Sequence, residues 1–381
     1  MADWNFHNPV RLLFGRGVRA GLVEELSGFR GVVVTTARGR QQLENDPILC
    51  EVFISGTEWA WVDNVQSNPD IESLDAAISR LQDHSSEVIL AFGGGSAIDS
   101  AKVLSVALAR QRSNVRALLA ESAPARDKAV PVYAVPTTAG TGSEVTPFAT
   151  VWDHVSRRKH SLAGPGVYPH SAIVDPALTD GLPEAVTLST GLDAINQAAE
   201  SIWNRNMSPL SELVAGRALE QGFKALPSLM QTPDDSALRD AMAETSLLAG
   251  MAISQTRTSL CHSISYPLTA HFGVPHGLAC AFTMPAVLRH NLPGDDGRFM
   301  RLARVLTGKE EAGHRELVEL FDQIHHELKV AKRVREYIEG PTELLALRDE
   351  MFTPGRADNS LVSVDKTEIE RILWTAWKPN G

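Results

Sequence analysis

The chain has 381 residues, of which 43% are apolar and 22% are charged, and its formal net charge is −10. These values are typical of a globular protein, and the length exceeds what one ordinary hydrophobic core needs, so we expect two domains. The acidic balance argues against nucleic acid as a partner, because no basic stripe offsets the acids. No apolar run approaches the ~20 residues that span a bilayer, so no membrane partner is expected.

Cysteine usage indicates a reducing compartment. The three cysteines, Cys50, Cys261 and Cys280, show neither paired nor C-x-x-C spacing. The N-terminal stretch MADWNFHNPVRLLFG also lacks the apolar segment of a secretion signal. We therefore expect a cytoplasmic enzyme.

The first half of the chain alternates between apolar strands and amphipathic helices. An extended segment is expected first, followed by a helix, at residues 5–14 and 17–26. Apolar runs predict buried strands at 31–36, 59–65, 87–92 and 131–136, and helical periodicity occurs at 67–84 and 97–109. This alternation predicts a parallel sheet covered by helices on both faces.

The pattern changes near residue 182, after which the periodicity is helical almost without interruption. The expected helices are 187–203, 209–227, 235–253, 258–270, 276–290, 297–306, 312–328 and 367–377. No β-branched run typical of a strand follows residue 182. The sequence therefore predicts an α/β domain at 1–181 and an all-helical domain at 182–381.

Two loops of the first domain have the composition of a nucleotide site. Gly93, Gly94, Gly95 and Ser96 stand between a strand and a helix, where backbone N–H groups can hold a diphosphate. A tight turn without a ligand is the alternative, and the G-x-G-x-x-G fingerprint is absent. The stretch PTTAGTGSEVT at 136–146 follows the next strand, and its hydroxyls and glycines make the nucleotide interpretation stronger.

The end of the strand at 31–36 bears on the choice of cofactor. An acidic residue there would bind a ribose 2′-hydroxyl and repel a 2′-phosphate. This chain has Thr36 instead, followed by Arg38 and Arg40. The pattern favours NADPH, with NADH as the alternative, because two surface arginines also occur by chance.

Four residues of the second domain form a candidate metal site. Asp193 and Gln197 are four residues apart on one face of a predicted helix, and His262 and His276 follow on later segments. A single histidine in a helix is more often structural than a ligand. One carboxylate, one amide and two imidazoles from separate helices can nevertheless converge on a divalent cation.

These motifs occur in the order found in one family. The chain carries FHNPVRLLFGRG, GGGSAIDSAK, PTTAGTGSEVTPFATV, IVDPALT, TGLDAINQAAES and HFGVPHGLACAFTMP, and so resembles the iron-containing (group III) alcohol dehydrogenases, which are related to dehydroquinate synthase and glycerol dehydrogenase. The resemblance implies an α/β N-terminal dinucleotide-binding domain, an all-α C-terminal metal-binding domain, and a homodimer or larger homo-oligomer. It also implies a set of cofactor contacts, namely Gly93, Gly94, Gly95, Ser96, Asp99, Thr137, Thr138, Thr141, Thr146, Lys159 and Leu178.

By the same resemblance, the metal ligands are Asp193, Gln197, His262 and His276, with Fe²⁺ in first place and Zn²⁺ as the alternative. The family usually has histidine where this chain has Gln197, and a second histidine where it has Tyr266. Arg257 lies five residues before His262, with hydroxyl side chains around it. An arginine in such a place is a good receptor for a phosphonate, sulfonate or carboxylate, unless it pairs with an acid elsewhere.

The whole pattern is most similar to the phosphonoacetaldehyde reductase branch. It implies reduction of a small anionic aldehyde, phosphonoacetaldehyde, to 2-hydroxyethylphosphonate in phosphonate natural-product biosynthesis. The expected catalytic residues are His262, His276, Tyr266 and His271, and the expected substrate contacts are Arg257, Phe148, Ile253 and Arg356. The alternatives are a reductase of sulfoacetaldehyde, a general alcohol dehydrogenase, and a catalytically silent nucleotide-binding relative.

Overall fold

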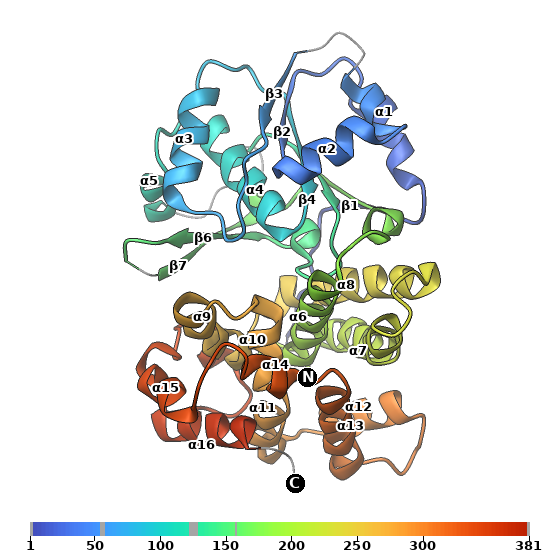
Figure 1. The fold of residues 1–381 in the computed structure, drawn as a ribbon, viewed down its shortest axis with the longest axis vertical. Coiled ribbons are helices and arrows are strands. Elements are labelled where there is room, and N and C mark those ends of the chain that lie inside the picture. Colours follow the sequence, from blue (N-terminus) through green and yellow to red (C-terminus); the bar gives the residue numbers. More distant parts are fainter. Residues whose placement is uncertain (1–2, 54–57, 122–128, 157, 379–381) are drawn as a thin grey trace. The chain divides into compact units, whose positions relative to one another are not determined.

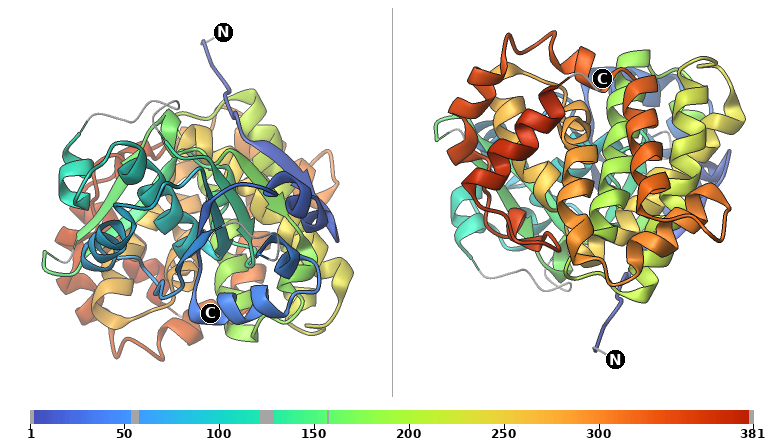
Figure 2. Two further views of the ribbon diagram at one scale, coloured as in Figure 1. Left: turned by 90° about the horizontal axis from the view of Figure 1, so that it is seen from above. Right: turned by 90° about the horizontal axis from the view of Figure 1, so that it is seen from below.

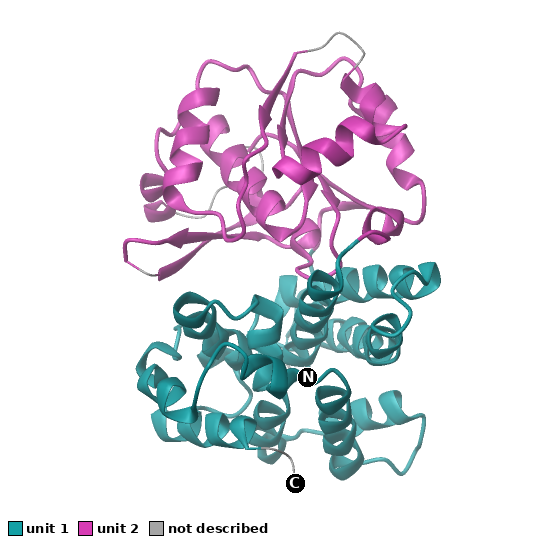
Figure 3. Cartoon of the chain, in the orientation of Figure 1, with its two compact units in different colours: residues 1–7, 182–381 teal, residues 8–181 magenta. Residues whose placement is uncertain are grey.

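The computed structural model describes residues 3–53, 58–121, 129–156 and 158–378. The chain divides into two compact units, coloured in Figure 3. Unit 2 consists of residues 8–181, and unit 1 consists of residues 1–7 together with 182–381. The division into folding domains at 1–181 and 182–381 remains a prediction.

Unit 2 contains a parallel sheet of six strands. In spatial order these are β1 (Arg11–Phe14), β8 (Ser171–Val174), β5 (Val132–Pro136), β4 (Val88–Gly93), β2 (Gly31–Val34) and β3 (Trp59–Val62). All neighbouring pairs are parallel, which confirms the predicted sheet. Because the strands are parallel, the loops that follow β2, β4 and β5 meet at one edge of the sheet.

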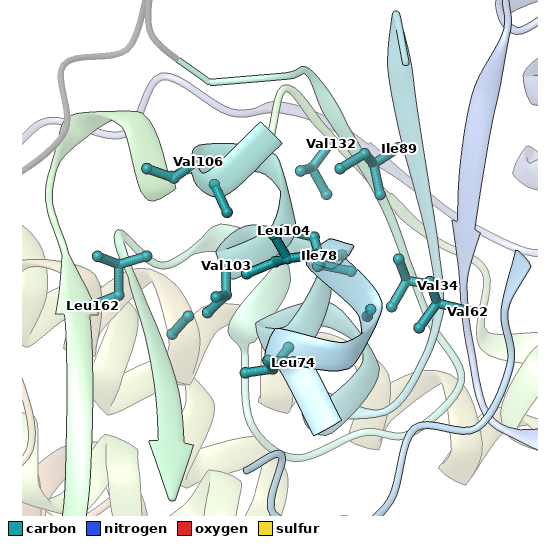
Figure 4. Packing of buried hydrophobic residues seen from close by; sticks show 14 of the residues in the cluster. Val34, Val62, Leu74, Ile78, Ile89, Val103, Leu104, Val106, Val132 and Leu162 are labelled. Atoms are coloured by element: carbon teal, nitrogen blue, oxygen red, sulfur yellow. The ribbon is translucent and has the colours of Figure 1, made fainter. Parts of the chain in front are cut away.

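Helices cover both faces of this sheet. On one face, α3 (Ile71–Leu81), α4 (Gly95–Ala109) and α5 (Val115–Ala120) pack on side chains of β2, β4 and β5. Figure 4 shows residues of α3 and α4 in this core, together with residues of the strands. On the other face lie α1 (Gly21–Glu25), α2 (Ala37–Asn45) and the turn of 3-10 helix at Leu49–Phe53. Strand β4 serves both cores: Ile89 faces the first and Leu90 the second.

Several elements of unit 2 are absent from the prediction, among them helices α2 and α5. Strands β6 (Phe148–Asp153) and β7 (Arg158–Ala163) form an antiparallel pair, and β8 completes the sheet between β1 and β5. Ala149, Val151 and Leu162 face the core, but Phe148 and Trp152 lie on the opposite face of β6, and most of β7 is charged or polar, so neither strand shows a regular apolar–polar alternation. Strand β8 is not predicted, although it is a buried strand of the same length as β2.

Unit 1 is helical throughout its described part, apart from an isolated bridge between Asn204 and Ser360. Helix α6 (Glu184–Ile202) lies at its centre and is buried along almost its whole length, with α7 (Pro209–Leu229), α8 (Ser236–Thr256), α9 (Leu260–Phe272) and α10 (His276–Phe282) packed around it (Figure 1). The remaining helices are α11 (Met284–Asn291), α12 (Arg298–Thr307), α13 (His314–Glu327), α14 (Val330–Val334), α15 (Pro341–Ala346) and α16 (Lys366–Trp377). Helix α11 lies beside α13 and α16 (Figure 2, right).

One predicted helix is wrong. The segment 276–290 forms two helices, α10 and α11, which are separated at Thr283. Pro285 accounts for the break, because it lacks a backbone N–H and its ring would clash with the carbonyl four residues earlier. None of the described helices combines the length and apolarity that a membrane-spanning segment needs.

Candidate metal centre and nucleotide loops

Four side chains of unit 1 converge within the core of the helical bundle. Asp193 of α6, His262 of α9, and His276 and Cys280 of α10 each place one ligand atom within 4.8 Å of the others; we call them the four-residue cluster. His262 Nε2 lies 3.3 Å from Asp193 Oδ1, and Cys280 Sγ lies 3.8 Å from His276 Nε2. The structure thus brings together three of the four predicted ligands, and adds a cysteine that the sequence analysis passed over.

Close backbone packing holds α10 against α6. A Cβ atom placed on Gly277 would lie 1.8 Å from the Ser189 carbonyl oxygen and 2.9 Å from the Asp193 nitrogen. Only glycine fits this contact, because backbone atoms cannot move aside as a flexible side chain can. The contact places His276, the neighbour of Gly277, directly beside the turn of α6 that carries Asp193.

A buried carboxylate orients His262. Glu200 accepts hydrogen bonds from the Ser259 backbone N–H (2.9 Å) and the His262 backbone N–H (3.2 Å), and its Oε2 lies 2.6 Å from His262 Nδ1. Burial raises the pKa of Glu200, but the His262 imidazole and these N–H groups outweigh it and hold the pKa below its usual value. A carboxylate at Nδ1 assigns the ring proton to that nitrogen, which leaves Nε2 as an acceptor facing Asp193.

The residues fit a bound divalent metal ion. Gln197 lies one turn after Asp193 on α6 and is 3% exposed, and its Oε1 has no hydrogen-bond partner among the described residues. A buried carbonyl oxygen without a partner is uncommon and suits a site that a cation completes. Two imidazoles, a carboxylate, an amide oxygen and a thiol are together a donor set for a first-row transition metal.

The two predicted proton donors lie in different surroundings. The Tyr266 ring stacks on His276, with centroids 6.3 Å apart and planes 18° apart, so it lies beside the four-residue cluster. His271, at the C-terminal end of α9, is exposed and its Nε2 lies 2.9 Å from Glu350 Oε2. The described contacts therefore bring Tyr266, and not His271, to the cluster.

Arg257 has an unusual backbone. It ends α8 with φ 63° and ψ 175°, a conformation that only glycine adopts easily. Its N–H donates to the carbonyl of Ile253, which is buried, and its own carbonyl accepts from Asn204 Nδ2 (3.1 Å) and Thr256 Oγ1 (3.0 Å). These fixed contacts hold the chain in the strained conformation.

A loop from far along the chain brings a second arginine into the neighbourhood of Arg257. Ser263 Oγ donates to the Met351 carbonyl and accepts from the Thr353 N–H, and Asn359 Nδ2 donates to the Thr258 carbonyl. The loop so anchored carries Arg356. Partial burial, and after it the Arg356 guanidinium, lower the pKa of Arg257. No carboxylate pairs with either arginine in the part of the chain that the structure describes.

In unit 2 the two predicted nucleotide loops pack against each other. Gly93 ends β4 with φ 152°, and its carbonyl accepts from the Thr137 N–H (3.0 Å). A Cβ on Gly94 would lie 3.0 Å from Thr138 Oγ1, and one on Gly95 would lie 2.6 Å from Thr141 Cγ2. The glycines are thus needed for the contact between the loops. Gly94 is the N-cap of α4, whose first turn carries Ser96, so the helix presents unpaired N–H groups at the same place.

A buried ion network lies behind these loops. Asp99 accepts from Ser143 Oγ and from the Thr150 N–H (2.8 Å). Lys102, 1% exposed, donates from Nζ to Ser143 Oγ (3.1 Å), to both oxygens of Thr146, and to the Phe148 carbonyl (2.9 Å). Burial lowers the pKa of Lys102 to about 8. The network stabilises the loop that Thr146 belongs to, and Lys102 is a residue that the sequence analysis did not single out.

The remaining predicted cofactor residues lie at separate points of unit 2. Thr36 is the N-cap of α2 and accepts from the Gly39 N–H (2.9 Å). Arg38 makes one weak contact, to the Gly181 carbonyl (3.4 Å), whereas Arg40 is bound to Asp63 (2.6 Å) and to Glu44. Lys159 lies over the Trp152 ring, and Leu178 is buried at the end of the sheet. Arg38 is therefore the arginine that remains available to a 2′-phosphate.

Comparison with known proteins assigns the family. The model of iron-containing alcohol dehydrogenases matches residues 9–176, and that of the C-terminal part of the same family matches residues 187–377. The chain belongs to the iron-containing alcohol dehydrogenase family, and is an oxidoreductase of alcohols and aldehydes. The predicted fold, an α/β unit followed by an all-helical one, is confirmed.

Three relatives illustrate the range of the family. A probable alcohol dehydrogenase of Escherichia coli, EutG, is 35% identical over 266 residues, which cover 70% of this chain and 67% of that one. The phosphonoacetaldehyde reductase of Streptomyces viridochromogenes is 40% identical over 234 residues, 60% of this chain and 59% of that one. The crystal structure of sulfoacetaldehyde reductase from Bifidobacterium kashiwanohense in complex with NAD⁺ is 27% identical, with a TM-score of 0.86 and full coverage of both chains.

Proposed function

We propose that this enzyme reduces phosphonoacetaldehyde to 2-hydroxyethylphosphonate with NADPH and a divalent metal ion, as a cytoplasmic homo-oligomer in phosphonate natural-product biosynthesis. The observation that carries the proposal is the pair Arg257 and Arg356. Asn359 Nδ2 donates to the carbonyls of Thr258 and Gly355 (2.9 Å each), which ties the neighbour of Arg257 to the neighbour of Arg356, and neither arginine has a carboxylate partner among the described residues. Like charges are stable together when an anion binds between them.

The pair favours a substrate with more than one negative charge. A phosphonate has three oxygens, which can accept hydrogen bonds from two planar guanidinium groups at once. Its second negative charge balances the positive charge of the second arginine. The strained backbone of Arg257 supports a functional role, because such conformations cost about 1–3 kcal/mol and persist mainly at ligand sites. Sulfoacetaldehyde is the second candidate, since a sulfonate has the same three oxygens and a structural relative bears that name.

The bound groups would supply the chemistry that the side chains lack: NADPH the hydride, and the metal ion a polarising charge at the carbonyl oxygen. The protein's residues do the rest. Asp193, His262 and His276, with Gln197 one turn after Asp193, would hold the cation, and Glu200 would keep His262 Nε2 free to bind it. Tyr266, stacked on His276, holds a proton at its Oη and donates it to the product oxygen.

The test is a comparison of charged and neutral aldehydes. Arg257→Ala should lower kcat/KM for phosphonoacetaldehyde about ten- to hundred-fold, because a charge-assisted contact of roughly 1.5–3 kcal/mol is lost. Arg257→Lys should recover part of the loss, since the ammonium keeps the charge but not the planar fork. Propanal reduction should change much less. Arg217→Ala, which removes an exposed arginine of α7, is the matched control.

Two results would refute the proposal. An equal loss for propanal and phosphonoacetaldehyde would assign Arg257 to structure instead of substrate binding. If the wild-type enzyme has the same kcat/KM for propanal as for phosphonoacetaldehyde, the proposal that the substrate is an anion is wrong. If the enzyme prefers sulfoacetaldehyde and Arg356→Ala does not change that preference, Arg356 does not bind the second negative charge of a phosphonate. Sulfoacetaldehyde is then the better assignment of the substrate.

A further inference from the structure

We propose that Cys280 is a ligand of the metal ion, that it takes the place of the imidazole which Gln197 does not provide, and that the centre is consequently a zinc site. This rests on the proposed function only in that both need a cation in the four-residue cluster. The family resemblance implies ligands at Asp193, Gln197, His262 and His276. Cys280 is not in that set, and only the structure of this chain places it among the ligands.

The spacing of the ligand atoms supports the assignment. Ligands at tetrahedral angles around zinc, with bonds of about 2.0–2.3 Å, lie roughly 3.3–3.6 Å from one another. His262 Nε2 and Asp193 Oδ1 are 3.3 Å apart, and Cys280 Sγ is 3.8 Å from His276 Nε2. All four ligand atoms lie within 4.8 Å of one another, so a small inward movement would complete a tetrahedron.

Cys280 lies on the side of α10 that packs against α6. His276 and Cys280 are four residues apart on α10, and therefore lie on the face that Gly277 presses against α6. Asp193 and Gln197 form the corresponding pair on α6. The His276–Cys280 pair of α10, Asp193 of α6 and His262 of α9 surround one point, and Gln197 follows Asp193 by one turn. The site therefore has five candidate ligands, of which the Gln197 amide is the weakest.

The chemistry of the cysteine points to the identity of the metal. A thiolate is a soft ligand that favours Zn²⁺ over harder cations, and among nitrogen and sulfur sites Zn²⁺ also binds more tightly than Fe²⁺. Cys280 is completely buried and is a free cysteine, so neither a disulfide nor solvent competes for its sulfur. Zinc is therefore expected here, in place of the iron by which the family is named.

The chain offers a matched control. Cys261 is also completely buried and free, and it adjoins His262, yet its sulfur is not part of the cluster. A substitution of Cys261 thus removes a buried thiol from the same neighbourhood without removing a proposed ligand. Cys280→Ser is preferred to Cys280→Ala as the test variant, because serine keeps nearly the same volume.

The experiment is titration of the full-length, metal-free protein with Co²⁺, followed by absorption spectroscopy. Wild type and Cys261→Ser should develop the intense near-ultraviolet charge-transfer band of a cobalt–thiolate bond, and Cys280→Ser should bind Co²⁺ without it. Zinc affinity, measured against a competing chelator, should fall more than about tenfold in Cys280→Ser alone. X-ray absorption of the wild-type zinc protein should show a sulfur neighbour at about 2.3 Å, a measurement that needs no variant.

Cobalt binding without a charge-transfer band in wild type, or a zinc shell of nitrogen and oxygen only, would overturn thiolate ligation. A protein isolated with iron after growth with both metals would overturn the zinc assignment. Neither outcome bears on the anionic substrate, which the Arg257 variants test. Absence of stoichiometric metal binding would instead refute this inference and the metal-assisted mechanism together.

Discussion

Replacing Glu200 by glutamine tests how the metal centre is organised. The Glu200 carboxylate is fully buried and accepts three hydrogen bonds, two from backbone N–H groups and one from His262 Nδ1. Glutamine has the same shape but offers one acceptor oxygen and one NH₂ group. Whichever way the amide is turned, at least one of the three donors faces another donor and is left buried without an acceptor.

The magnitude follows from those three contacts. An unpaired buried donor costs about 1–3 kcal/mol of folding free energy. Loss of the charge that orients a ligating imidazole typically weakens metal binding 10- to 100-fold, or about 1.4–2.8 kcal/mol. We therefore expect Glu200→Gln to lower both the unfolding midpoint and the metal affinity, while Tyr266 and the arginine pair remain in place.

The assay is metal competition with a chelator, together with urea unfolding of the metal-free protein. Glu184→Gln makes the same chemical change on the same helix, at a carboxylate that is exposed and pairs with Arg333, and should leave both quantities unchanged. If Glu200→Gln binds metal as tightly as wild type, then His262 is positioned by packing alone. In that case our account of its tautomer is wrong.

Three further predictions concern the cofactor, the ligands and acid stability. Thr36→Asp should shift the preference from NADPH toward NADH by repelling the 2′-phosphate, and should not destabilise α2 because aspartate is an equally good N-cap; a wild type that uses NADH as well as NADPH would contradict this. His276→Ala should abolish metal binding and activity together, whereas Gln197→Ala should mainly loosen the metal; full activity of a chelated, metal-free preparation would refute both. Burial lowers the pKa of His325 to about 4, so the folded protein holds it neutral: its contribution to stability is complete above pH 6.5 and is lost as the pH falls toward 4. The loss between pH 7 and pH 5 should be about 2 kcal/mol, and His325→Gln should remove that part of the pH dependence measured by urea unfolding.

The sequence predicts best those elements whose residues act locally. Strands β2 and β4 are continuous apolar runs because both faces of the sheet are covered, and their assignment needs no tertiary information. The β6–β7 pair shows no regular alternation of apolar and polar residues, and Pro285 interrupts a periodicity that otherwise continues through α10 and α11. Both elements are short, and their boundaries depend on the neighbouring elements that they pack against.

Side chains that are far apart in the sequence but close together in the structure are harder to predict. The order of motifs identifies Asp193, His262 and His276. Cys280 does not stand out, because its spacing matches neither a disulfide nor a C-x-x-C motif, and only its i, i+4 relation to His276 indicates a ligand. The position of Arg356 beside Arg257 depends on hydrogen bonds from Ser263 and Asn359 across about a hundred residues. No sequence period encodes such a contact, since it arises from the path of a loop.

Lys102 makes the nucleotide loops open to study by chemical labelling. Its ammonium group is buried and donates to Ser143, Thr146 and Phe148 at once, so an acylating reagent can reach the amine only after these segments separate from α4. Exposed lysines such as Lys224 should be acylated at the rate set by the reagent. Lys102 should instead react at a rate set by local opening. Its acylation rate, measured by mass spectrometry, would therefore report how often the cofactor loops open.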